Sequence, residues 1–239
     1  MADSLRITLR VELETALHIL GPGRPVVLVD KPLELDSQGY PLIPASTIRG
    51  RLRVHLERLL RGLDLPVCFP PRPERLCPHV WGQQPAPEDG YCIACRVFGS
   101  PWREAGLAAS DLRLVADQRS QFAPALLRQE RAGVSLSRRL GAAQNERLFM
   151  IESTVPRANA EALRFEGTLE GRLSSAEAGW LLATLPLVAH IGGGKSRGLG
   201  GVRLRATAVA WWRNGSWTAA DPDALLTEVL GDATDPYHA

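Results

Sequence analysis

Lysine is nearly missing from this chain of 239 residues, because Lys31 and Lys195 are the only two among its 28 lysines and arginines. Arginine therefore carries almost all of the positive charge, and its planar guanidinium can bind a phosphate through two parallel hydrogen bonds. A GC-rich genome would also enrich arginine, so this count alone does not identify a ligand. The net charge of +2 is too small to indicate a partner either.

Long apolar runs are also missing. No stretch of 18 apolar residues is present, which argues against a membrane-spanning helix. The first 14 residues, MADSLRITLRVELE, alternate between apolar and polar side chains and lack the apolar segment of a secretion signal. We therefore expect a cytoplasmic protein with no membrane partner. With 45% hydrophobic residues the chain can form one substantial core, and we expect a single domain over residues 1–239 that carries insertions.

Cysteine is scarce, and all four cysteines fall in one region: Cys68, Cys77, Cys92 and Cys95. The surrounding residues 63–104 are rich in proline and glycine and show little periodicity, which is typical of an insertion without a core of its own. Disulfides are not expected in a reducing compartment. Cys92 and Cys95 have the C-x2-C spacing that lets two thiolates reach one ion, so the four could hold a structural Zn2+. His79 could replace one of them, and four ordinary buried cysteines are the plainer alternative.

The spacing of apolar residues in the N-terminal half predicts a first β-α-β unit. Residues 5–13 alternate as a half-buried strand, residues 45–62 place leucines at helical intervals, and a second strand is expected within residues 110–117. Ser46 or Thr47 could cap the helix. The helix also carries arginines away from its apolar stripe, and a solvated face is sufficient to explain them.

A second unit follows in the C-terminal half. Residues 163–173 alternate as a strand, and Ser174 with Glu177 forms a capping box that begins a helix. This helix is expected to run towards residue 190 unless Pro186 kinks it or ends it early. A last strand begins at residue 202. Two such units predict an α+β protein with a ferredoxin-like, RRM-type core.

The segment HIGGGKSRGLGGVRL, residues 190–204, joins the second helix to the last strand and contains six glycines. A nucleotide-binding P-loop would need a glycine where Ala189 stands and a helix where the last strand begins, so this motif is not expected. A simple glycine-rich connector is one interpretation. Consecutive glycines beside Lys195, Ser196 and Arg197 favour another, in which backbone and cations bind anionic oxygens.

A long segment, residues 18–44, separates the first strand from the first helix. Asp30 stands there beside Lys31, and a carboxylate in such a loop could bind a divalent ion or take part in proton transfer. Exposed loop aspartates are common, however, and Asp36 is explained by the turn that it begins. For His18, at the end of the first strand, a packed or exposed residue without a special role is the simplest interpretation.

Five segments occur in a characteristic order: LETALHILGPG (13–23), VDKPLELDSQGYPLIPASTIRGRLR (29–53), CIACRVFGSP (92–101), GVSLSRRLGAAQNERLFMIESTVP (133–156) and HIGGGKSRGLGGVRL (190–204). Together they resemble the RAMP superfamily, the repeat-associated proteins of CRISPR systems. The chain is most similar to the repeating backbone subunit of type III CRISPR effector complexes. No single segment is decisive, whereas the ordered set is specific.

The resemblance implies an RRM-type palm with an inserted zinc-stabilised region at residues 63–104 and a protruding thumb hairpin at residues 118–157. In this family, subunits stack into a filament along a guide RNA, and each thumb intercalates into the duplex that the guide forms with target RNA. Some subunits cut the target beside the displaced nucleotide, using a divalent cation and a loop aspartate. The implied partners are guide RNA, complementary target RNA, other RAMP subunits and copies of the chain itself.

Carried onto this chain, the resemblance gives the catalytic role to Asp30, with Mg2+ or Mn2+ as the cation. It gives RNA binding to residues from the loop after the first strand, the first helix, the thumb and the glycine-rich segment: His18, Ser46, Thr47, Arg49, Arg53, Val134, Leu136, Arg138, Arg139, Gly192, Gly193, Gly194, Lys195, Ser196 and Arg197. The chain departs from the family pattern at Leu20, where glycine is usual, and at Ser137, where aspartate is common.

Two alternatives stay open at this point. The superfamily contains backbone and capping subunits that bind RNA without cutting it. It also contains the endonuclease that trims precursor guide RNA, for which His18 would be a candidate general base. The thumb-like segment and the cysteine insertion argue against this second alternative.

Overall fold

The computed structural model describes residues 4–21, 29–81, 87 and 89–231. The predicted single domain of residues 1–239 and the predicted insertion of residues 63–104 are therefore each described only in part. Residues 82–86 and 88 of the insertion lie outside the described residues.

One antiparallel sheet forms the centre of the described chain. Its strands lie in the order β11 (Ser216–Ala219), β10 (Val202–Arg213), β1 (Ser4–Leu13), β9 (Arg164–Arg172), β4 (Leu112–Leu114) and β2 (Leu42–Ile43), and β3 (Leu107–Ala109) also pairs with β9. Along the chain, β1, β4, β9 and β10 combine with two helices as β-α-β-β-α-β, which is the ferredoxin-like arrangement. The predicted α+β class is confirmed.

The central strand β1 explains why the sheet has two unlike faces. Its odd-numbered residues, from Leu5 to Leu13, are buried beneath the helices, as the period-two alternation predicts. Its even-numbered arginines point to the other face and form ion pairs with β9: Arg6 with Glu170 and Arg10 with Glu166. The helix-free face of the sheet is therefore polar and internally paired.

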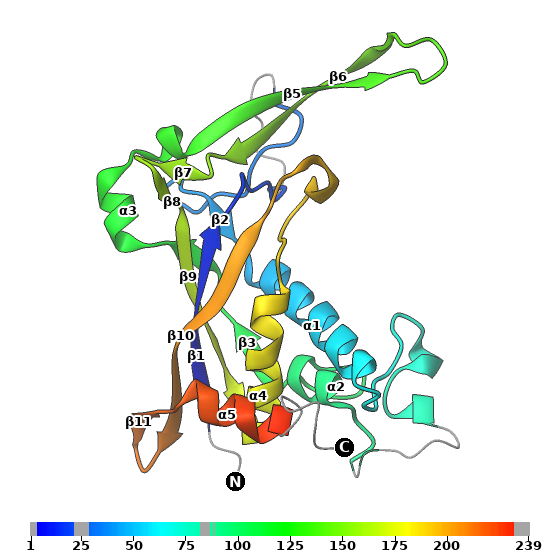
Figure 1. The fold of residues 1–239 in the computed structure, drawn as a ribbon, viewed down its shortest axis with the longest axis vertical. Coiled ribbons are helices and arrows are strands. Elements are labelled where there is room, and N and C mark those ends of the chain that lie inside the picture. Colours follow the sequence, from blue (N-terminus) through cyan, green and yellow to red (C-terminus); the bar gives the residue numbers. More distant parts are fainter. Residues whose placement is uncertain (1–3, 22–28, 82–86, 88, 232–239) are drawn as a thin grey trace, which may run out of the picture.

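Helices α1 (Ala45–Gly62) and α4 (Ser175–Thr184) cover the apolar face of the sheet (Figure 1). Ile48, Leu52, Leu56 and Leu60 form the fully buried stripe of α1. A third helix, α5 (Pro222–Leu230), packs against α4 at Gly179, where an added Cβ would lie 2.3 Å from the Leu225 carbonyl oxygen.

Helix boundaries differ from the sequence expectation in two places. The residue before the first turn of α1 is Pro44, and neither Ser46 nor Thr47 caps the helix. Both lie inside the first turn, because α1 begins one residue before Ser46. The helix expected to reach residue 190 ends at Thr184 and continues as a 3-10 turn, η4 (Leu185–Leu187), since Pro186 has no N–H to extend an α-helix.

A separate two-stranded hairpin, β5 (Arg128–Leu136) and β6 (Ala143–Thr154), projects from one end of the sheet (Figure 1). It is shorter than the expected residues 118–157, because α3 (Ala116–Gln121) and the turn η3 (Pro124–Leu127) occupy the first part of that range. The short strands β7 (Arg157–Ala158) and β8 (Glu161–Ala162) return the chain to the sheet.

The cysteine-containing insertion lies near the C-terminal end of α1 (Figure 1). Its regular structure consists of the 3-10 turns η1 (Pro73–Arg75) and η2 (His79–Trp81) and one short helix, α2 (Ile93–Phe98). These short elements explain why the insertion has no periodic apolar pattern. Cys92 precedes α2 and Cys95 lies in its first turn, so the helix places the C-x2-C pair side by side.

Candidate functional site

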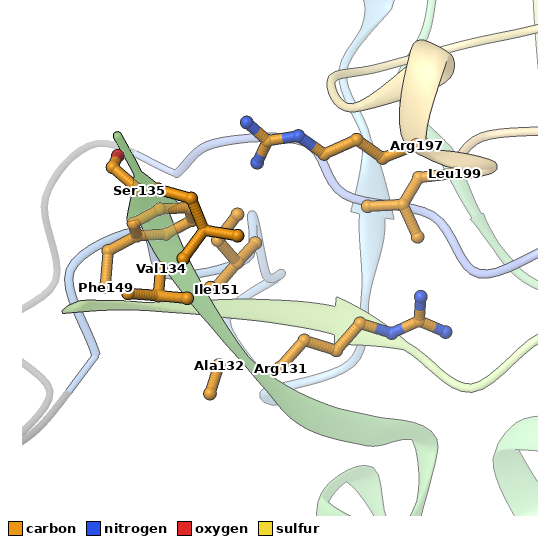
Figure 2. Close-up of a pocket in the computed structure, with 10 residues that line it drawn as sticks. Arg131, Ala132, Val134, Ser135, Phe149, Ile151, Arg197 and Leu199 are labelled. Atoms are coloured by element: carbon orange, nitrogen blue, oxygen red, sulfur yellow. The ribbon is translucent and has the colours of Figure 1, made fainter. Parts of the chain in front are cut away.

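A cavity of about 530 Å3 lies between the β5–β6 hairpin and the glycine-rich segment (Figure 2). We call this cavity the hairpin groove. Residues 131–136 and the side chains of Phe149 and Ile151 form the hairpin wall, and Arg197 with Leu199 forms the opposite wall. The groove thus brings together two segments that the sequence resemblance assigned to RNA binding.

The glycine-rich segment is held against the end of β1 by close backbone contacts. Gly192 has φ of +78°, and a Cβ there would lie 2.3 Å from the His18 carbonyl oxygen. The amide of Gly193 donates to the same oxygen at 2.8 Å, and the amide of Gly200 donates to Ala16. These glycines therefore allow the segment to approach the chain's own backbone, and they leave a short 3-10 turn, η5 (Lys195–Arg197), exposed for a ligand.

The groove is positively charged and contains an aromatic ring. The Arg197 guanidinium lies 5.6 Å from the ring centroid of Phe149, and the Lys31 ammonium lies 5.8 Å from it. Arg131 and Arg197 line the groove itself, whereas Lys31 lies beside the Phe149 ring. Among the residues that the structure describes, none of these three cations forms an ion pair with a carboxylate. Unpaired cations beside an aromatic ring suit a ligand that has both negative charge and flat bases.

Phe149, Arg131 and Lys31 were not among the site residues predicted from the sequence. Phe149 occupies the position opposite Gly133 in the hairpin register. A Cβ at Gly133 would lie 2.4 Å from the Phe149 ring, so the missing side chain leaves room for the ring on β5. The sequence signal that could have identified Phe149 is a glycine opposite an aromatic residue in a hairpin. This signal can be recognised only when the strand register is known.

Several large apolar side chains of the hairpin are exposed. Val134 and Leu148 face each other across the strands and are 47% and 71% exposed, and Leu136 is 62% exposed. Arg138 and Arg139 lie in the turn between the strands and are also exposed. A projecting hairpin that carries exposed apolar groups provides wedges of the kind that separate stacked bases.

Asp30 lies beside the hairpin. Its amide and that of Lys31 donate to the Met150 carbonyl oxygen, and its carboxylate oxygen Oδ2 accepts a hydrogen bond of 2.7 Å from the Met150 amide. The side chain is exposed. The only group of three or more potential metal ligands among the described residues is the cysteine cluster, so Asp30 offers a single carboxylate. One carboxylate fits Mg2+ when phosphate and water supply the other ligands.

His18 is not among the described residues that line the groove, and it is only 7% exposed. Its Nδ1 is 2.7 Å from the Glu152 carbonyl oxygen, and its carbonyl accepts the hydrogen bond from Gly193. His18 therefore connects β6 to the glycine-rich segment from inside the protein. This position suits a residue that holds the two walls of the groove in place.

Arg49 and Arg53 point away from the groove and towards the insertion. Arg49 donates to the Phe98 carbonyl oxygen at 2.7 Å. Arg53 donates to Glu57 at 2.9 Å and to the Gly99 carbonyl oxygen at 2.9 Å, and it lies 3.8 Å from the Cys95 sulfur. Burial alone would lower the pKa of Arg53, but the Glu57 carboxylate and the nearby cysteines raise it.

The four cysteines form a compact cluster. Their Sγ atoms all lie within 4.8 Å of one another, with Cys68 and Cys95 at 3.4 Å and Cys68 and Cys92 at 3.8 Å, and no disulfide joins them. Zinc–sulfur bonds of about 2.3 Å in a tetrahedron place the sulfurs about 3.8 Å apart. The four residues therefore fit a bound Zn2+. His79 packs instead against the Trp102 ring, with 4.5 Å between the centroids.

Close packing of four thiols also affects their protonation. Hydrogen bonds with Cys68, Cys77 and Cys95 lower the pKa of Cys92, whereas hydrogen bonds with Cys68, Cys77 and Cys92 raise the pKa of Cys95. A divalent cation can replace the remaining protons because it stabilises all four thiolates together.

The fold and the groove define a class of protein: a ferredoxin-like α+β core with a projecting hairpin, beside which lie cations that form no ion pair with any described carboxylate. The chain belongs to the RAMP superfamily, whose family model matches residues 10–203. Membership indicates an RNA-binding, CRISPR-associated subunit. No curated protein gives a match to the chain. None of the described helices is long and apolar enough to cross a membrane.

Proposed function

We propose that the protein is a guide-RNA-binding backbone subunit of a type III CRISPR effector complex. In this proposal the guide RNA lies across the exposed turn of residues 195–197, and the β5–β6 hairpin inserts between bases of the guide–target duplex. Other copies of the chain and other RAMP subunits bind the same RNA strand. The observation that carries the proposal is the hairpin groove, where cations that form no ion pair with a described carboxylate lie beside exposed apolar side chains of the hairpin.

The physical basis for filament formation is repetition of weak contacts. Phosphate contacts by Arg and Lys are independent of base sequence, so one subunit can bind any guide. Exposed apolar side chains on the hairpin can offset the cost of unstacking a base step, which is a few kcal/mol for intercalating wedges. Side-by-side copies would repeat this insertion at regular intervals along the duplex.

Cleavage of the target RNA is the further part of the proposal, and Asp30 is its catalytic residue. The 2′-hydroxyl oxygen of the displaced nucleotide attacks the adjacent phosphorus, and the bond from phosphorus to the 5′-oxygen breaks. The 2′-hydroxyl loses its proton, and the leaving 5′-oxygen gains one, which yields a 2′,3′-cyclic phosphate and a 5′-hydroxyl. Asp30 either takes part in proton transfer or helps to hold a hydrated Mg2+ or Mn2+, which would stabilise negative charge on the phosphate.

The decisive test uses the complex assembled by co-expression with its partner subunits and guide RNA. Bound RNA is sequenced, and cleavage of a complementary RNA is measured for the wild type, Asp30→Ala and Asp64→Asn. Asp64 is the control because it is an exposed carboxylate that follows the C-terminal end of α1 and does not line the hairpin groove. We expect all three complexes to contain guide RNA and only Asp30→Ala to lose cutting. Undiminished cutting by Asp30→Ala would exclude Asp30 as the catalytic residue.

A non-catalytic backbone or capping subunit is the second candidate. It is favoured by the single carboxylate at Asp30, one oxygen of which already accepts a hydrogen bond from Met150. In that case the assembled wild-type complex binds target RNA without cutting it. The precursor-processing alternative has less support, because the candidate base His18 is buried.

A further inference from the structure

A second basic cavity, of about 290 Å3, is also lined by the glycine-rich segment, but by other residues of it than the hairpin groove. Arg51, His55 and Arg58 line it from α1, and His190 and Lys195 line it from the segment that follows α4. We call this cavity the α1 pocket. None of its members except Lys195 was singled out from the sequence. It contains no carboxylate among the described residues that line it.

The α1 residues of this pocket share one face of the helix, because they are spaced at i, i+4 and i+7. Among the residues that the structure describes, Arg51, Arg58 and Lys195 form no ion pair with a carboxylate. The pocket thus concentrates three permanent positive charges without an internal counter-charge.

The other arginines of α1 make the contrast clear. Arg49 and Arg53 are engaged by the insertion, as described above, and Arg61 donates to the Cys68 carbonyl oxygen at 3.3 Å and lies over the Phe69 ring. These three arginines are committed to internal contacts. Among the described residues, Arg51 and Arg58 have no comparable hydrogen bond or ion pair, so they are the α1 arginines best placed to bind an external anion.

The glycine-rich segment connects the two basic cavities. Lys195 and Arg197 are two residues apart in the exposed turn η5, yet Lys195 lines the α1 pocket and Arg197 lines the hairpin groove. A strand of RNA that crosses this turn would therefore meet cations on both sides of it. Three permanent charges in the α1 pocket exceed the charge of one phosphodiester, so the pocket suits consecutive phosphates or a doubly charged phosphate ester.

We propose that the α1 pocket is a phosphate-binding site, in which Arg51, Arg58 and Lys195 hold the phosphate oxygens and the imidazoles of His55 and His190 donate hydrogen bonds to them. The source of the phosphate is the backbone of the RNA strand that passes over residues 195–197, and in this respect the inference rests on the proposed function. A small phosphate compound has the same chemistry, and the experiment separates the two sources.

The RNA source is tested with the full chain and a fluorescently labelled single-stranded RNA of about 20 nucleotides, over a series of salt concentrations. The variant is Arg51→Gln/Arg58→Gln. Its control, Arg113→Gln/Arg205→Gln, removes the same charge from two exposed arginines on the helix-free face of the sheet. We expect the pocket variant to lower RNA affinity about tenfold and to reduce the slope of log Kd against log salt by roughly one to two, with a smaller change in the control.

The phosphate chemistry is tested separately by titrating inorganic phosphate and following the imidazole NMR signals. We expect saturable shifts of His55 and His190, assigned through His55→Gln and His190→Gln, that disappear in the pocket variant while His79 stays unchanged. If the wild type binds no RNA, the proposed function fails, and the phosphate titration alone then shows whether the α1 pocket binds phosphate. If phosphate shifts the imidazole signals but the two double variants bind RNA equally well, the pocket binds the phosphate of a small compound rather than that of RNA. Unshifted imidazoles together with equal RNA binding would overturn the inference.

Discussion

Gly133 and Phe149 occupy opposite positions in the β5–β6 hairpin, and the Phe149 ring fills the space where a Gly133 side chain would lie. A Cβ on Gly133 would approach the ring to 2.4 Å. The ring is also the surface over which Lys31 and Arg197 lie. The position of one glycine therefore determines how the aromatic group of the hairpin groove is presented.

The first prediction is that Gly133→Ala displaces the Phe149 ring and weakens RNA binding several-fold. The cost to stability should be about 1 kcal/mol or less, because the half-buried ring can move towards solvent. RNA binding and the thermal midpoint are the measurements. Gly62→Ala is the control, since a Cβ there meets nothing within 4 Å. Equal RNA affinity in both variants would show that the placement of the ring does not matter.

The second prediction concerns the cysteine cluster. The purified chain should contain one zinc per molecule by elemental analysis, because four sulfurs lie at separations that fit tetrahedral zinc. Strong chelators should lower the thermal midpoint by about 6 °C or more, which corresponds to roughly 2–3 kcal/mol in a protein of this size. Cys92→Ser should have a similarly low midpoint and should lose its response to chelator. A chelator response that persists in Cys92→Ser would place the metal elsewhere.

The sequence was sufficient for the regular core because its pattern repeats. Alternation in residues 5–13 and 163–173 and the leucine spacing of residues 45–62 correspond to β1, β9 and α1. The capping box of Ser174 and Glu177 is present, with both reciprocal hydrogen bonds. Strands and helices that bury one face must show these periods, so the fold class could be predicted from one chain.

The sequence did not predict which neighbours the arginine side chains of α1 contact. Arg49, Arg51, Arg53 and Arg58 all lie off the apolar stripe of α1, but two of them contact the insertion and two line the α1 pocket. The division depends on where the insertion and the glycine-rich segment pack around the helix. Long-range packing of this kind leaves no local pattern in the sequence. The spacing of residues in α1 therefore could not distinguish the four arginines, and Arg49 and Arg53 were chosen from the resemblance alone.

The third prediction compares one arginine from each of these two groups, Arg53 and Arg51, and expects opposite effects on stability and on RNA binding. Arg53→Gln should destabilise the protein by about 2 kcal/mol, because it leaves the buried Glu57 carboxylate, only 8% exposed, without its partner. Arg51→Gln should leave stability nearly unchanged and weaken RNA binding. Denaturant unfolding and RNA titration of the two variants provide the comparison. Loss of RNA affinity in Arg53→Gln with unchanged stability would support the RNA-binding role that the sequence resemblance gives to Arg53.

The last prediction concerns His55 in the α1 pocket. Burial lowers its pKa below the ordinary value, and the charges of Arg58 and Arg51 lower it further, while His190 and Lys195 line the same pocket. Arg58→Gln should therefore raise the pKa of His55, whereas Arg205→Gln, on the helix-free face of the sheet, should not. An NMR titration of the imidazole is the direct measurement, and an unchanged pKa in Arg58→Gln would contradict the arrangement described for the pocket.

The same shift makes folding stability depend on pH with a definite sign. Because the folded protein holds the pKa of His55 below that of the unfolded chain, the unfolded state binds the proton more readily. The contribution of His55 to stability is thus complete above the ordinary histidine pKa of about 6.5 and decreases as the pH falls through the lower folded value. Arg58→Gln should reduce this acid-dependent loss relative to Arg205→Gln, because a neutral side chain no longer repels the imidazolium.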